Sequence, residues 1–87
     1  MTEQIANAAN TLIPAFLALQ TKGYRVWWER GDNAPDDETW YAEGPLGRFV
    51  ADDSVGLLGL VAMRELRGLD WKAGDEQIND FMRDYNA

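Results

Sequence analysis

The chain has 87 residues, no cysteine and no histidine, and its 15 acidic and 8 basic side chains leave a net charge of −7. The missing residue types exclude disulfides, thiolate nucleophiles, histidine-dependent catalytic pairs and the usual zinc and iron–sulfur ligand sets. The negative charge repels phosphate backbones and anionic lipids, so the sequence predicts no direct nucleic-acid binding and no membrane contact. Such a charge suits either a basic protein partner or simply solubility.

The length and composition are typical of a single compact domain spanning residues 1–87. Hydrophobic residues make up 46% of the chain, and four Trp, three Tyr and three Phe supply large side chains for a core. The N-terminal segment has neither the basic start nor the cleavage site of an export signal, and no apolar stretch reaches the roughly 20 residues that span a bilayer. These features predict a soluble, cytoplasmic protein.

Residues 2–22 carry the periodicity of an amphipathic helix, with Ile5, Ala9, Leu12 and Phe16 among its apolar positions. Pro14 interrupts this pattern, because an interior proline removes a backbone hydrogen bond and clashes with the preceding turn. We therefore expect a kinked or two-part helix, with a second start in which Asn10 or Thr11 is the cap and Pro14 falls in the first turn.

Three short strands are expected next, over residues 24–30, 39–43 and 48–51, because apolar and polar side chains alternate there. A loop rich in Gly, Asn, Pro and Asp joins the first two strands over residues 31–38. The second and third are joined by Gly44-Pro45-Leu46-Gly47, a sequence typical of a tight turn. This arrangement predicts an antiparallel meander.

The most apolar stretch runs from Asp52 to Leu69 and predicts a central helix. Asp52, Asp53 and Ser54 are residues that cap helix N-termini. At the other end, Gly68 follows a basic last turn and is expected to adopt a positive φ, with Leu69 folding back on the helix. A helix that is apolar on most sides must be covered by the rest of the chain or by a second chain.

A last helix is expected over residues 75–85, where Ile78, Phe81, Met82 and Tyr85 repeat at i, i+3, i+4 and i+7. The order α-β-β-β-α-α predicts an α+β fold, a three-stranded antiparallel meander with helices packed on one face. The α-β-β-β-α part is similar in element order to a double-stranded-RNA-binding domain. Such domains bind phosphates through basic side chains at the start of their final helix. This chain has Asp52 and Asp53 at that place, which opposes RNA binding.

Alternation along the strands divides the sheet into two faces. The more apolar set on the first strand, Tyr24, Val26 and Trp28, is expected to face the helices, so Trp27 faces outward. The outer face then holds a candidate partner-binding set of residue types enriched at interface hot spots: Arg25, Trp27, Tyr41, Arg48 and Val50. Two other interpretations remain open: cross-strand pairing that only stabilises the sheet, or coverage of this face by Phe81 and Tyr85 of the last helix.

Several other groups of residues have ordinary structural explanations. The acidic loop is expected to be solvated, since its spacing differs from that of a calcium-binding loop; its acids are Asp32, Asp36, Asp37 and Glu38. Asp52 and Asp53 are explained as helix caps rather than as a catalytic carboxylate pair. Gly56, Gly59 and Ala62 give the central helix a small face, for which packing within the chain is favoured over a homodimer contact.

These features together predict a small acidic protein without enzymatic activity and without catalytic residues, cofactor or metal. The role expected is a protein-binding or inhibitory module of the immunity-protein or antitoxin kind, because complementary charge accelerates encounter with a basic partner and aromatic anchors hold it. Two alternatives remain: a homo-oligomeric structural protein, which includes a homodimer, and a small enzyme that depends on carboxylates.

Overall fold

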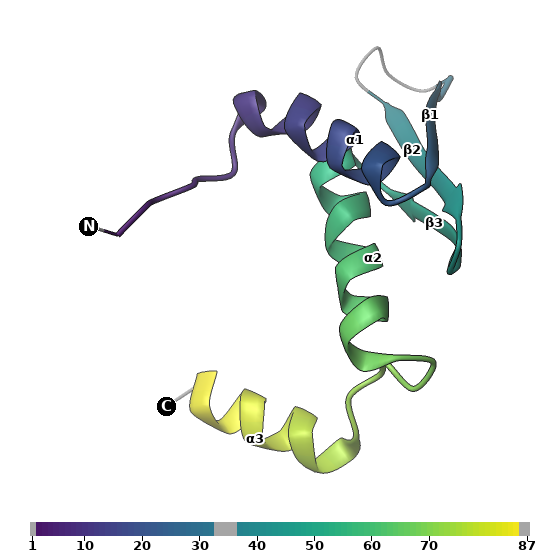
Figure 1. Cartoon of the computed structure of the whole chain (residues 1–87). Helices are drawn as coiled ribbons and strands as arrows, with labels where there is room; N and C mark the ends of the chain where they lie inside the picture. Colours follow the sequence, from purple (N-terminus) through teal and green to yellow (C-terminus); the bar gives the residue numbers. More distant parts are fainter. Residues whose placement is uncertain (1, 33–36, 86–87) are drawn as a thin grey trace.

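A computed structural model describes residues 2–32 and 37–85 of the chain (Figure 1). A short 3-10 turn and a helix are followed by three strands and two further helices, and this order confirms the predicted α+β fold. The elements are η1 (Ala9–Thr11), α1 (Leu12–Thr21), β1 (Arg25–Arg30), β2 (Glu38–Gly44), β3 (Gly47–Ala51), α2 (Ser54–Arg67) and α3 (Asp75–Tyr85).

The three strands form an antiparallel sheet in the order β1-β2-β3. Gly44 pairs with Gly47 across a loop of two residues, and Gly47 has a φ of +126°, a conformation that L side chains rarely adopt. Helices α1 and α2 cover one face of this sheet (Figure 1). The opposite face meets none of the described helices.

The core lies where α1 and α2 meet the sheet. Leu19 of α1 and Leu57 and Val61 of α2 are fully buried, and Tyr24 and Ala42 complete the buried cluster. Leu57, rather than the neighbouring Leu58, is therefore the buried leucine of α2. The partly buried residues packed against this cluster are Val26, Trp40, Phe49, Ala51 and Leu58.

The predicted helix over residues 2–22 is wrong in its first part. Residues 2–8 form no helix, and α1 begins only at Leu12, so that Pro14 falls in its first turn. Thr11 stands at the N-cap and donates its hydroxyl hydrogen to the carbonyl of Ala8 at 2.6 Å. The second start expected near Asn10 or Thr11 is the start of α1, where Pro14 is tolerated because its missing N–H would be free in a first turn. The 3-10 turn η1 precedes it, and the Thr11 side chain makes no capping hydrogen bond to α1.

Helix α2 has the predicted capping residues. The Asp53 side chain accepts a hydrogen bond from the backbone N–H of Gly56 at 2.7 Å, which satisfies one free donor of the first turn. Gly68 ends the helix with a φ of +77° and a ψ of −161°, so the predicted positive φ is confirmed. Leu69 remains 86% exposed, and the expected return of this side chain onto the helix does not occur.

Helix α3 has its predicted bounds but stands apart from the sheet and from α1 (Figure 1). None of its residues is buried. The radius of gyration is 15.7 Å, whereas a compact chain of this length has about 12 Å. Within residues 2–32 and 37–85, no helix is both long enough and apolar enough to cross a membrane.

Candidate functional site

The sheet brings the predicted partner-binding residues together on its outer face. Trp27 of β1 pairs with Tyr41 of β2, and Tyr41 pairs with Val50 of β3. Glu43 of β2 lies between Arg25 and Arg48 in the neighbouring register. Because side chains at i and i+2 of a strand share a face, all five predicted residues lie on one side of the sheet.

The centre of this surface is an aromatic stack flanked by two arginines. The rings of Trp27 and Tyr41 lie 5.3 Å apart at an interplanar angle of 12°. The guanidinium carbon of Arg25 lies 4.5 Å from the centre of the Trp27 ring, and that of Arg48 lies 5.3 Å from the centres of both rings. Each such cation–π contact contributes about 0.5–1 kcal/mol at a surface, so the four side chains hold one another in place. We call them the aromatic–arginine cluster.

Exposure differs across this surface. Trp27 and Tyr41 are half-buried, because the cross-strand neighbours cover part of each ring. Val50 is 50% exposed and the Arg48 side chain 56%. Phe81 and Tyr85 do not cover this face, since they stack on each other in α3 and are 64% and 75% exposed. The cluster therefore meets solvent along its edges.

The described carboxylates form no group of three that could hold a metal ion. Asp53 is occupied as the cap of α2. Of the acidic loop, Asp36 lies outside the described residues.

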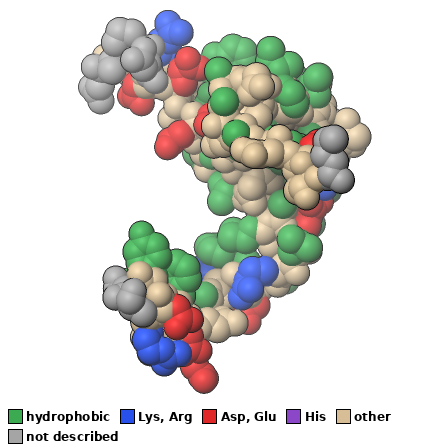
Figure 2. Space-filling view, turned by 90° about the vertical axis from the view of Figure 1, so that its left-hand side faces the viewer, with side chains coloured by type: hydrophobic (Ala, Val, Ile, Leu, Met, Phe, Trp, Pro, Cys, Tyr) green, Lys and Arg blue, Asp and Glu red, His purple; other side chains and the backbone are tan. Residues whose placement is uncertain are grey.

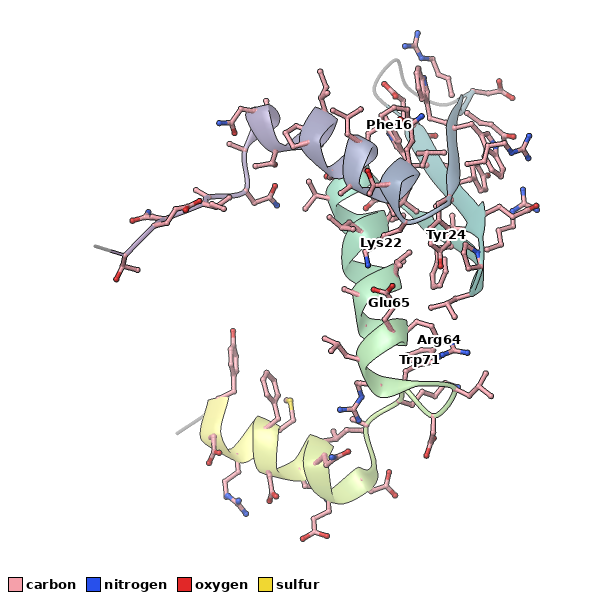
Figure 3. All side chains as sticks on the ribbon, in the orientation of Figure 1. Phe16, Lys22, Tyr24, Arg64, Glu65 and Trp71 are labelled. Atoms are coloured by element: carbon pink, nitrogen blue, oxygen red, sulfur yellow. The ribbon has the colours of Figure 1, made fainter. Side chains whose placement is uncertain are left out.

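A second apolar surface lies on the helix side of the sheet and was not predicted from the sequence. Trp28 and Trp40 stack with ring centres 4.9 Å apart, and beside them α1 leaves an open groove of about 420 Å³. Figure 3 shows Phe16 between α1 and the sheet, at this groove. The lining residues are Leu12, Ile13, Phe16, Leu17, Trp28 and Trp40.

This groove lies beside the first two turns of α1. Trp28 faces the helix layer as expected, yet it is 54% exposed, and Ile13 and Leu17 of α1 are also exposed. The alternation along β1 predicts which face holds Trp28, but it does not predict how much of the ring a helix covers.

Comparison of the chain with protein-family models, with curated proteins and with solved structures found no significant match. The functional argument therefore depends on the geometry and chemistry of the described residues.

Proposed function

We propose that this protein is a non-enzymatic protein-binding module that docks on its partner through the outer face of the sheet. The observation that carries the proposal is the aromatic–arginine cluster, in which Trp27 and Tyr41 are stacked and flanked by Arg25 and Arg48. Trp, Tyr and Arg are the residue types that dominate the binding energy of protein interfaces.

The cluster is ordered before any partner arrives. Each ring is held by its cross-strand neighbour and by a guanidinium, so little side-chain entropy remains to be lost on binding. These residues lie on paired strands rather than on loops, which favours a defined docking geometry over an adaptable one. Val50, beside the stack, adds apolar area at the edge of the surface.

The charge of the whole chain favours a basic partner. A net charge of −7 attracts such a protein over distances longer than a hydrogen bond, and the attraction accelerates encounter. An inhibitory role, as in immunity proteins and antitoxins, fits these properties because a small acidic chain can cover the functional surface of a basic enzyme. The proposed role is occlusion and includes no chemical step.

Capture of a binding partner from lysate of the native host tests this proposal. We expect the wild-type chain to retain a partner, and Trp27→Ala and Val50→Glu to lose it. The loss should persist at low salt as well as at about 0.5 M salt, where long-range attraction is screened. Trp71→Ala is the matched control, because Trp71 is 40% exposed but lies in the connector before α3, outside the sheet (Figure 3).

The fold must survive these changes for the result to count. Val50 is half exposed, so Val50→Glu should leave the melting temperature nearly unchanged. Trp27→Ala removes one cross-strand aromatic pair, worth about 0.5–1.5 kcal/mol, and the two contacts with Arg25 and Arg48, worth about 0.5–1 kcal/mol each. Partner capture that is equally strong for wild type, Trp27→Ala and Val50→Glu would place the binding surface elsewhere and refute the proposal.

A further inference from the structure

Helix α3 carries an apolar face that none of the described residues buries. Its four members occur at i, i+3, i+4 and i+7, the spacing of helices that dock into apolar grooves. In Figure 2 the lower part of the molecule contains α3 and the upper part contains α1 and the sheet. Hydrophobic side chains lie on the side of the lower part that is turned toward the upper part, with acidic and basic side chains below them. The members and their exposed fractions are Ile78 47%, Phe81 64%, Met82 47% and Tyr85 75%.

The side of α2 that is turned away from the core is also apolar, and it is exposed at Gly59 and Leu66 and partly buried at Val55 and Ala62. Val55, Gly59, Ala62 and Leu66 follow one another at i, i+4, i+7 and i+11, opposite the buried Leu57 and Val61. Leu66 is 86% exposed, and a side chain placed at Gly59 would meet no atom within 4 Å. Figure 1 shows the sheet on one side of α2 and α3 leading away from the lower end of α2 on the other side. The space-filling view shows a hollow between α3 and the upper part of the molecule, which we call the notch (Figure 2).

The connector between α2 and α3 holds the notch open. Gly68 turns the chain with its positive φ, and the Arg67 side chain then donates to the carbonyl of Trp71 at 2.7 Å. The N–H of Gly74 donates to the side-chain oxygen of Gln77 at 2.8 Å and fixes the start of α3. These contacts direct α3 away from the body formed by α1, α2 and the sheet, so the apolar faces of α2 and α3 do not close on each other.

The exposed area indicates the size of the missing contact. The chain exposes 6996 Å², whereas a compact protein of 9.8 kDa exposes about 5,200 Å². The excess is about 1,800 Å² per chain, and the exposed residues 2–8 supply part of it. If α2 and α3 supply half, two chains that each buried that share would bury about 1,800 Å² together, which is the size of a standard specific interface.

We propose that a second copy of this chain covers the notch. The apolar face of α3 from each copy packs into the notch of the other, against α2 and α3, in a symmetric dimer. Such a contact requires that one chain present both an apolar ridge and an apolar recess, and this chain does so. The proposal goes beyond the docking function, because the aromatic–arginine cluster lies across the sheet and stays outside the dimer contact.

Sedimentation equilibrium of the full chain tests the dimer. We expect twice the monomer mass of 9.8 kDa at micromolar concentration, and the monomer mass for Phe81→Glu and for Leu66→Glu. Asn79→Glu is the matched control, because it adds the same charge to α3 more than a quarter turn from the centre of the apolar face. We expect this variant to remain a dimer. The contact is apolar, so about 0.5 M salt should not dissociate it.

Neither Phe81 nor Leu66 is buried in the single chain, so both glutamate variants should leave the melting temperature of the body unchanged. A monomeric wild type, or a dimer that survives both Phe81→Glu and Leu66→Glu, would overturn the inference. Either outcome leaves partner capture by the outer face untouched. Loss of capture in Trp27→Ala and Val50→Glu without loss of the dimer supports both proposals separately.

Discussion

The body of the molecule, formed by α1, α2 and the sheet, buries the apolar faces of its helices, whereas α3 leaves its apolar face exposed. Both contain amphipathic helices, but α1 and α2 bury Leu19, Leu57 and Val61 completely against the sheet, while α3 buries no residue at all. Helices shorter than about 12–15 residues are marginal without packing, and α3 has 11 residues. Contacts within the body therefore stabilise it, whereas the helical structure of α3 depends on what its apolar face contacts.

The comparison of α2 with α3 shows that the same apolar pattern can be covered by the same chain or left exposed by it. The i, i+3, i+4 and i+7 repeat predicts a helix and the face that will be covered, but it does not say which molecule covers that face. In α2 the cover comes from the same chain on one side only. In α3 we propose that it comes from a second copy.

The largest expected effect is on the body. Leu57→Ala should lower the free energy of unfolding by about 2–5 kcal/mol, because it leaves a cavity at a fully buried site. Met82→Ala in α3, where the side chain is 47% exposed, should change it by less than about 0.5 kcal/mol. Urea unfolding in the Phe81→Glu background measures both without a contribution from assembly. Similar losses at the two sites would show that α3 belongs to the folded body.

The parts of the fold that local chemistry determines were predictable. Alternation indicated the three strands and the sharing of a face by Trp27 and Tyr41, and Asp53 and Gly68 marked the ends of α2. The predicted bounds of α3 are also those observed. In each case the residues that determine the element lie within it or directly beside it.

The parts that depend on distant contacts were not predictable. Residues 2–8 have a helical pattern but stay exposed and form no helix, since an apolar pattern alone does not stabilise a short helix. Trp28 faces the helix layer and is still 54% exposed. The direction of α3 depends on the backbone angles of Gly68 and on the hydrogen bonds of the connector, which a pattern of apolar residues does not specify. The notch follows from the direction of α3.

Substitution of Gly68 tests the turn that joins the body to α3. Its φ of +77° with a ψ of −161° is a conformation almost restricted to glycine, so Gly68→Ala should cost about 1–3 kcal/mol. Gly59→Ala is the matched control, because Gly59 is helical with open space around it and alanine should stabilise α2 by up to about 1 kcal/mol. Far-UV circular dichroism during urea unfolding, again in the Phe81→Glu background, gives both values. Equal effects of the two alanines would mean that the turn tolerates a side chain.

Ser54 tests the junction of α1 and α2. Its fully buried hydroxyl donates to the carbonyl of Leu12 at 2.7 Å and ties the start of one helix to the start of the other. Ser54→Ala should destabilise the body by about 0.5–1.5 kcal/mol, because one buried hydrogen bond is lost without a change in volume. Asp52→Ala, at an exposed position two residues earlier, should be close to neutral in the same thermal melt. A neutral Ser54→Ala would show that packing alone fixes the two helices.

The smallest expected effect compares an ion pair between elements with one inside α3. Lys22 at the end of α1 contacts both carboxylate oxygens of Glu65 on α2 at 2.9 Å (Figure 3). The two side chains are 38% and 37% exposed, so solvent screens the pair and it should stabilise the body by only about 0.5 kcal/mol. A double-mutant cycle with Lys22→Met and Glu65→Gln isolates this coupling, which should fall as salt rises.

The pair between Arg83 and Asp80 has the same 2.9 Å distance but lies within one helix. Asp80→Asn should therefore leave unfolding of the body unchanged and lower only the helical signal of α3, because its contact joins no second element. A measurable effect of Asp80→Asn on the body would mean that α3 shares its unfolding transition, and the distinction between the two regions would then fail.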